Sequence, residues 1–133
     1  MDGLTPVQIS ELVTLLEDAI SACATRLEQG AATATTAGGA ERASIYNEID
    51  HLEAELAWIQ WMRENHPDHE ESGFPSAAVA EHIQGMRGGI ERWRVKLLRN
   101  DAHGDANYIH SLENSIAIVG NILEMFDQVG GLG

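Results

Sequence analysis

Residues 41–65 read ERASIYNEIDHLEAELAWIQWMREN, and this stretch decides the fold. Its apolar side chains recur at steps of four, three, four and three, at Ile45, Ile49, Leu52, Leu56 and Ile59. The spacing places all five on one side of an α-helix and also matches a heptad seam, so the helix needs a partner lying nearly parallel or antiparallel to it.

Three further stretches have apolar residues at the same helical spacing, over residues 5–29, 76–103 and 105–129. The first begins with Thr5, Pro6 and Gln8, a pattern typical of an N-cap, a first helical position and a capping box. The connector at 30–40 contains small residues and few anchors, so we expect it to be flexible. The sequence predicts a single all-α domain over 1–133, an antiparallel up-and-down four-helix bundle with long helices and short loops.

Composition narrows the class of protein. The chain has 133 residues and a formal net charge of −13, which argues against a nucleic-acid or anionic-membrane surface over most of the molecule. The single cysteine, Cys23, falls within an apolar stripe and is interpreted as a small core residue. No apolar run approaches the length of a membrane span and no secretory signal is expected. We therefore predict a cytoplasmic protein, with a virion as the alternative location, and no membrane partner.

One candidate metal site lies on the helix predicted at 41–65. Glu48, His51 and Glu55 follow the pattern Glu-x-x-His-x-x-x-Glu on one flank of the seam. Glu-x-x-His is the half-motif of di-iron carboxylate bundles, because residues three apart project side by side. A symmetric dimer would have to supply the second half, by analogy with encapsulated ferritins. We favour an ion pair or a hydrogen-bonded histidine on this flank, and we expect no cofactor.

A second candidate is residues 98–104, which read LRNDAHG. The segment resembles the signature of HEPN domains, helical proteins that cleave RNA or bind nucleotides, although its Arg-to-His spacing is shorter. The resemblance implies that Arg99 would stabilise phosphate and that His103 would help to activate a ribose hydroxyl, with Asn100 as the other residue of the motif. The alternative is a polar helix terminus, where Arg and His near the last carbonyls are favoured anyway. We favour a non-catalytic protein over this enzyme.

The helix predicted at 76–103 has two unusual features. Gly85, Gly88 and Gly89 fall in its middle, each costing roughly 1 kcal/mol relative to alanine, and we expect close helix packing or a local kink there. Five of the eight basic residues lie within 87–99. We interpret them as paired with acids of the helix at 41–65, so a nucleic-acid partner is not expected.

The helix predicted at 105–129 carries a second apolar stripe beside its core stripe. Its members lie at steps of four, three and four: Ile118, Ile122, Met125 and Val129. Trp58 and Trp61 also fall off the core seam of their own helix, and exposed tryptophans with an apolar patch are typical of an interface. The sequence therefore predicts a non-catalytic, acidic interaction or assembly protein that acts through this apolar face. Its partner would be a second copy or another protein, as in an oligomer, an adaptor or a viral structural subunit.

Overall fold

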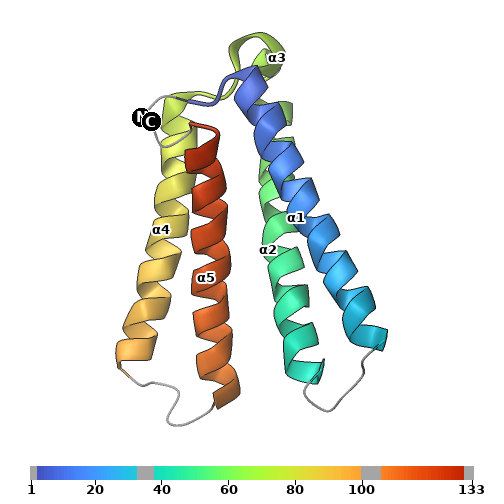
Figure 1. The fold of residues 1–133 in the computed structure, drawn as a ribbon. Helices are drawn as coiled ribbons and strands as arrows, with labels where there is room; N and C mark the ends of the chain where they lie inside the picture. The colour runs from blue at the N-terminus through green and yellow to red at the C-terminus, as the bar shows by residue number, and fades with distance from the viewer. Residues whose placement is uncertain (1–2, 33–37, 100–105, 131–133) are drawn as a thin grey trace.

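The computed structural model describes residues 3–32, 38–99 and 106–130, and it shows an all-α bundle. Four long helices lie side by side (Figure 1): α1 at Pro6–Ala32, α2 at Gly38–Asn65, α4 at Ser76–Leu98 and α5 at Ala106–Gln128. A short helix, α3 at His69–Ser72, lies in the connection between α2 and α4. The described ranges contain no strand, only an isolated bridge between Leu4 and Phe74. The predicted fold class is confirmed.

The helix ends differ in places from those predicted. Helix α1 continues to Ala32 and α2 already begins at Gly38, so both enter the predicted connector at 30–40. The centre of that connector, 33–37, lies outside the described residues, as does 100–105. Helix α4 begins at Ser76 and is described to Leu98, whereas the sequence suggested a helix reaching residue 103.

The start of α1 is fixed by two local devices. The Thr5 N–H donates to Gln8 Oε1 at 2.9 Å and the Gln8 N–H donates to Thr5 Oγ1 at 3.2 Å, so the predicted capping box forms. Just before it, Leu4 and Phe74 exchange two backbone hydrogen bonds of 3.2 and 2.8 Å. Gly73, with φ of +74°, makes the turn that brings Phe74 to this bridge. The α3–α4 connection is thereby attached to the entry of α1.

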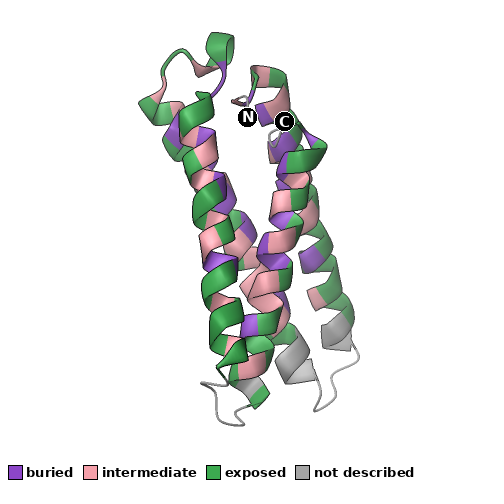
Figure 2. Ribbon diagram, turned by 90° about the vertical axis from the view of Figure 1, so that its left-hand side faces the viewer, coloured by how far each residue is buried: buried purple, intermediate pink, exposed green. Residues whose placement is uncertain are grey.

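The long helices pack as two hairpins, α1 with α2 and α4 with α5, and α5 joins them by also contacting α2 and α1. Buried and half-buried residues follow the facing sides of the helices, while exposed residues cover the outer sides (Figure 2). The apolar core contains residues from both hairpins, including Leu12, Leu16, Leu52, Ile83 and Phe126.

Part of the contact between α2 and α5 is polar rather than apolar. Asn47 Nδ2 donates to Ser115 Oγ at 3.2 Å, and Ser44 Oγ lies 3.0 Å from His110 Nε2. These residues belong to the first half of each helix, toward the end of the bundle away from α3. Hydrogen bonds between specific pairs help to set the register of the hairpins at this end.

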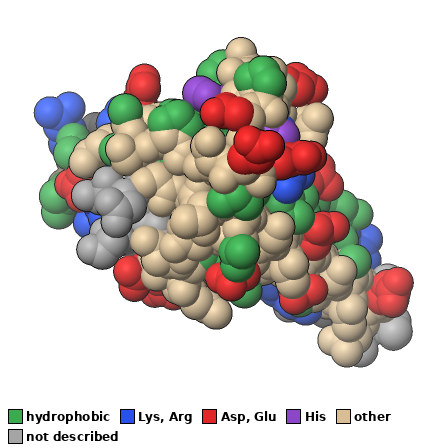
Figure 3. All heavy atoms as spheres, turned by 90° about the horizontal axis from the view of Figure 1, so that it is seen from above, with side chains coloured by type: hydrophobic (Ala, Val, Ile, Leu, Met, Phe, Trp, Pro, Cys, Tyr) green, Lys and Arg blue, Asp and Glu red, His purple; other side chains and the backbone are tan. Residues whose placement is uncertain are grey.

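The surface is acidic on three of the four long helices. Figure 3, which views the α3 end of the molecule, shows acidic side chains across this face, and α3 itself carries Glu70 and Glu71.

A membrane-spanning helix needs a long apolar stretch, and none of the helices in the described part of the chain has one.

Candidate functional site

The apolar stripe predicted to be an exposed face of α5 is not exposed. Ile118, Ile122 and Val129 are buried within the chain itself, with Ile122 only 1% exposed, and Met125 packs partly buried against the core. The prediction that these four form an uncovered face is therefore wrong. The physical reason is that α5 contacts α4, α2 and α1, so both of its apolar stripes are covered by neighbours.

The two tryptophans have different environments. Trp58 is partly buried and packs against the core, so its predicted exposure is wrong. Its ring stacks on His82 with a centroid distance of 3.9 Å and an interplanar angle of 5°, and it lies edge-on to Phe74 at 5.8 Å. Trp61 is 55% exposed, as the pattern predicted.

The structure does not bring Glu48, His51 and Glu55 together around one point. Glu48 faces α1, where it accepts from Cys23 Sγ at 3.1 Å and from Arg26 Nη1 at 3.3 Å. Glu55 instead faces α4. Within the described residues, no group of three or more His, Cys, Asp or Glu side chains is placed to hold a metal ion. The preferred interpretation of this flank is an ion pair or a hydrogen-bonded histidine. Glu48 does form an ion pair, with Arg26, whereas the histidine that bonds Glu55 is His82 and not His51.

The partner of Glu55 is His82 of α4, at 2.6 Å between Glu55 Oε2 and His82 Nε2. Glu55 is only 7% exposed and is the one buried charged residue in the described part of the chain. An ionised carboxylate only accepts hydrogen bonds, so the imidazole N–H donates. Trp58 stacks on one face of the imidazole. The three side chains form a Glu55–His82–Trp58 cluster that links α2 to α4.

Beside this cluster is a cleft of about 410 Å³ between α2, α4 and α5. Its walls include Glu55 and His82, the apolar side chains of Met86 and Ile122, and, near its other end, Arg92. We call it the α2–α4 cleft. It combines an apolar floor with a few polar groups, as small-molecule sites do.

His51 and Trp93 form another wall of the α2–α4 cleft. Their rings meet edge to face with centroids 6.1 Å apart. Burial lowers the pKa of His51 below its ordinary value, although the nearby Asp50 and Glu55 carboxylates oppose the effect. At neutral pH the ring therefore lines the cleft as an uncharged hydrogen-bonding group.

Two of the three glycines of α4, Gly85 and Gly89, lie in the wall of the cleft. A Cβ built at Gly85 would meet no atom within 4 Å, so close packing, which the sequence suggested, does not account for this glycine. A Cβ at Gly88 would lie 3.4 Å from Arg92 Nη1, and one at Gly89 would lie 3.7 Å from Arg92 Nη2. The arginine guanidinium thus lies against the glycine turn of its own helix.

Cys23 has the environment of a structural thiol. It is fully buried, and burial together with the Glu48 carboxylate raises the pKa of Cys23 to about 11. The thiol therefore stays protonated at neutral pH, which makes it a poor nucleophile and agrees with its interpretation as a core residue.

The HEPN-like residues are described only in part. Arg99 caps the end of α4, where its N–H donates to the Val95 carbonyl at 3.0 Å. Asn100 and His103 lie outside the described residues.

The last turn of α4 carries an exposed leucine among cations. Leu98 is 86% exposed, and Arg94, Lys96 and Arg99 are exposed around it. Arg94 pairs with Glu91 of its own helix at 3.0 Å. Among the side chains that the structure describes, which do not include that of Glu41, no carboxylate of another helix forms an ion pair with these cations, so the predicted pairing with the acids of α2 is not observed for Glu48 and Asp50. We call Arg94, Lys96, Leu98 and Arg99 the basic end of α4.

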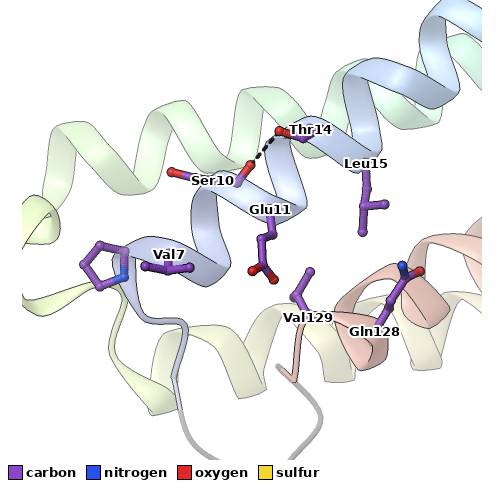
Figure 4. Close-up of a pocket in the computed structure, with 8 residues that line it drawn as sticks. Val7, Ser10, Glu11, Thr14, Leu15, Gln128 and Val129 are labelled. Atoms are coloured by element: carbon purple, nitrogen blue, oxygen red, sulfur yellow. Dashed lines mark hydrogen bonds between the residues drawn. The ribbon is translucent and has the colours of Figure 1, made fainter.

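A groove lies at the opposite end of the bundle, between the start of α1 and the end of α5 (Figure 4). Its volume is about 620 Å³, and it is lined by Val7, Glu11 and Leu15 of α1 and by Gln128 and Val129 at the end of α5. Val7 is 66% exposed, and the Glu11 carboxylate points into the space beside Val129. We call this hollow the α1–α5 groove.

Comparison of the chain with protein-family models, with curated proteins and with solved structures returns no match. The sites are therefore interpreted from their own geometry.

Sequence reasoning missed His82, the α2–α4 cleft and the α1–α5 groove. A signal for His82 did exist, because Glu55 is three residues after Leu52 and four before Ile59, both of which are buried. An acid at that position requires a buried partner.

Proposed function

We propose that the protein is a non-catalytic assembly subunit whose copies associate head to tail. In this arrangement the basic end of α4 in one copy occupies the α1–α5 groove of the next. The proposal keeps the interaction function predicted from sequence and moves the contact away from the buried face of α5.

The observation that carries the proposal is the exposed Leu98. A large aliphatic side chain in water forgoes roughly 1.5–3 kcal/mol that burial would provide. Leu98 is 86% exposed at a helix end, where Arg94 and Lys96 form no ion pair with another helix among the side chains that the structure describes, that of Glu41 not being one of them. Such an apolar side chain, at a helix end that carries cations, fits an apolar hollow that contains a carboxylate.

The α1–α5 groove has that character. Val7, Leu15 and Val129 provide its apolar lining and Glu11 its carboxylate. Helix α4 ends at the opposite end of the bundle from the start of α1, so the two surfaces cannot meet within one copy (Figure 1). A contact between different surfaces of two copies is heterologous, and it generates a ring if the rotation closes or a filament if it does not.

The net charge of −13 opposes association of copies, but salt screens the repulsion between charges that lie far apart on the two copies. At physiological ionic strength the Debye length is about 8 Å, so a local contact between opposite charges outweighs the repulsion of distant ones. The contact area is small, and we expect weak association that is visible at about 1 mM protein, where a free energy of about −4 kcal/mol suffices.

Sedimentation velocity on two complementary variants tests the proposal. Leu98→Glu removes the apolar side chain and keeps the groove, while Val7→Glu with Ser10→Glu, both at exposed positions in the wall of the groove, blocks the groove and keeps the basic end of α4. Each variant alone should be monomeric, and an equal mixture should form dimers that grow no further, because only one intact contact remains. Tyr46→Glu is the matched control. It places a glutamate at an exposed position of α2 that belongs to neither surface, so this variant should associate like the wild type.

Two results would refute the head-to-tail contact. One is a wild type that stays monomeric at 1 mM. The other is association that survives Leu98→Glu and is abolished by Trp61→Ala, which would place the contact on the exposed tryptophan of α2 instead.

A further inference from the structure

We propose that the α2–α4 cleft is a binding site for a small organic monocarboxylate with an apolar body. The site is separate from the surfaces assigned to assembly, and the proposal does not depend on them. It rests on the space that the glycines of α4 leave open and on the position of Arg92 beside that space.

The open space is maintained at a cost in helix stability. Glycine in a helix interior is about 1 kcal/mol less favourable than alanine, and α4 has three glycines within five residues. Close approach of another helix does not explain Gly85, because a Cβ there would touch nothing within 4 Å. Gly85 and Gly89 form part of the wall of the cleft, and the space beside Gly85 is open. The absence of side chains at these positions therefore preserves about 410 Å³, enough for a small ligand.

Arg92 provides the anion-binding group. Its guanidinium lies over Gly88 and Gly89 at the wall of the cleft, and no described carboxylate forms an ion pair with it. The planar fork of an arginine matches the two oxygens of a carboxylate, and charge-assisted hydrogen bonds of this kind are among the stronger ones.

The remaining walls define the rest of the ligand. Met86, Ile122 and the edge of Trp93 offer apolar contacts for its body. Glu55 and Glu81 also line the cleft, and the carboxylate of Glu55 is already engaged by His82. A second negative charge on the ligand would meet these acids unfavourably, so the cleft should prefer a monoanion to a dianion.

The test uses 4-phenylbutyrate as the probe, with neutral 4-phenylbutyramide as its isostere. Both are titrated into ¹⁵N-labelled protein while the amide signals of the α4 glycines and the indole signals are followed by NMR. We expect saturable shifts at Gly85, Gly88, Gly89 and the Trp93 indole, and no comparable shift at Gly73 in the α3–α4 connection. Loss of the charged contact should weaken binding of the amide by about tenfold or more.

Matched variants distinguish this site from general adsorption. Gly85→Leu fills the cleft while improving helix propensity, so it should fold and lose binding by at least about tenfold. Gly120→Leu is its control, because a Cβ at Gly120 also meets nothing within 4 Å but lies outside the cleft. Arg92→Gln should weaken phenylbutyrate to the level of the amide, whereas Arg87→Gln, an exposed arginine on the same helix, should not.

Three results would overturn the proposal. The first is the absence of saturable shifts at the α4 glycines up to about 10 mM probe, a concentration at which even a free energy of about −3 kcal/mol would be detected. The second is equal binding by Gly85→Leu and the wild type. The third is equal affinity for the acid and the amide, which would leave an apolar hollow without a carboxylate site.

Discussion

Replacing His82 with leucine should lower the free energy of unfolding by about 3 kcal/mol, because the change leaves Glu55 as an unpaired buried carboxylate. The hydrogen bond between them is short, at 2.6 Å, and joins two helices that belong to different hairpins. The change therefore tests whether the Glu55–His82–Trp58 cluster holds α4 against α2.

The size of the expected loss in the free energy of unfolding follows from the burial of Glu55 and His82. Removing one partner of a buried pair, so that a charge is left without compensation, typically costs about 3–5 kcal/mol. The Glu55 side chain is 10% exposed and that of His82 is 19% exposed, so some water can reach the carboxylate in the variant and the lower end applies. Loss of the stacked contact with Trp58 adds about 0.5–1.5 kcal/mol, which the apolar contacts of leucine partly replace.

Urea unfolding followed by circular dichroism is the assay, applied to His82→Leu, Glu55→Leu and the double variant. The double variant should recover to within about 1 kcal/mol of the wild type, because replacing a whole buried pair by apolar residues is often neutral. Glu53→Leu, at an exposed position of the same helix, is the control and should change stability by less than about 0.5 kcal/mol. A His82→Leu cost below about 1 kcal/mol, or strictly additive effects in the double variant, would refute the reasoning.

Further predictions concern pH, capping and one glycine. The folded protein keeps the proton of Cys23, whose pKa is raised to about 11, while the unfolded chain releases it above about pH 8.5. Stability should therefore fall as pH rises from 9 to 11, and urea midpoints should show less loss in Cys23→Ala. Burial lowers the pKa of His51, so below about pH 6.5 the unfolded chain binds a proton that the folded protein does not. Stability should decrease as pH falls through this range, and His51→Phe should reduce that decrease in parallel urea titrations. Thr5→Ala removes the capping box and should cost about 1 kcal/mol, measured by thermal unfolding. Gly73→Ala should cost about 2 kcal/mol in the same assay, because φ is +74° and a Cβ would lie 2.0 Å from the Leu4 carbonyl oxygen; an unchanged melting temperature would contradict this.

The helical pattern was predictable from the sequence because it depends on local periodicity. Ile45, Leu52 and Ile59 are buried on the seam that their spacing indicates, and the α1 capping box forms from adjacent residues. Helix α3 was not predicted, since a single turn within a segment containing Pro67 and Gly73 has no periodic signal.

The number of neighbours around a helix was not predictable in the same way. Two apolar stripes on α5 are compatible either with two covering helices or with one helix and an exposed face. The structure has the first arrangement, and Ile118 and Ile122 are buried against neighbours on both sides. Periodicity gives the width of an apolar arc, whereas the helices that cover it depend on the tertiary arrangement.

The same limit applies to Glu48 and Glu55. They are seven residues apart, so an ideal helix places them on nearly the same flank. Glu48 nevertheless meets Cys23 and Arg26 of α1, while Glu55 meets His82 of α4. Sequence spacing identifies groups that project from a helix in one direction, but it does not specify which helix they meet at each level of the bundle.

Both proposed sites depend on how the two hairpins dock. The α1–α5 groove is lined by one helix from each hairpin, and the α2–α4 cleft is lined by α2 of one hairpin and by α4 and α5 of the other. Apolar contacts tolerate small displacements of the hairpins, whereas the Glu55–His82 pair and the Asn47–Ser115 hydrogen bond each require one register. These polar contacts are at different heights along α2, so together they restrict both sliding and rotation. Weakening either contact should therefore alter the shape of both sites before it unfolds any helix.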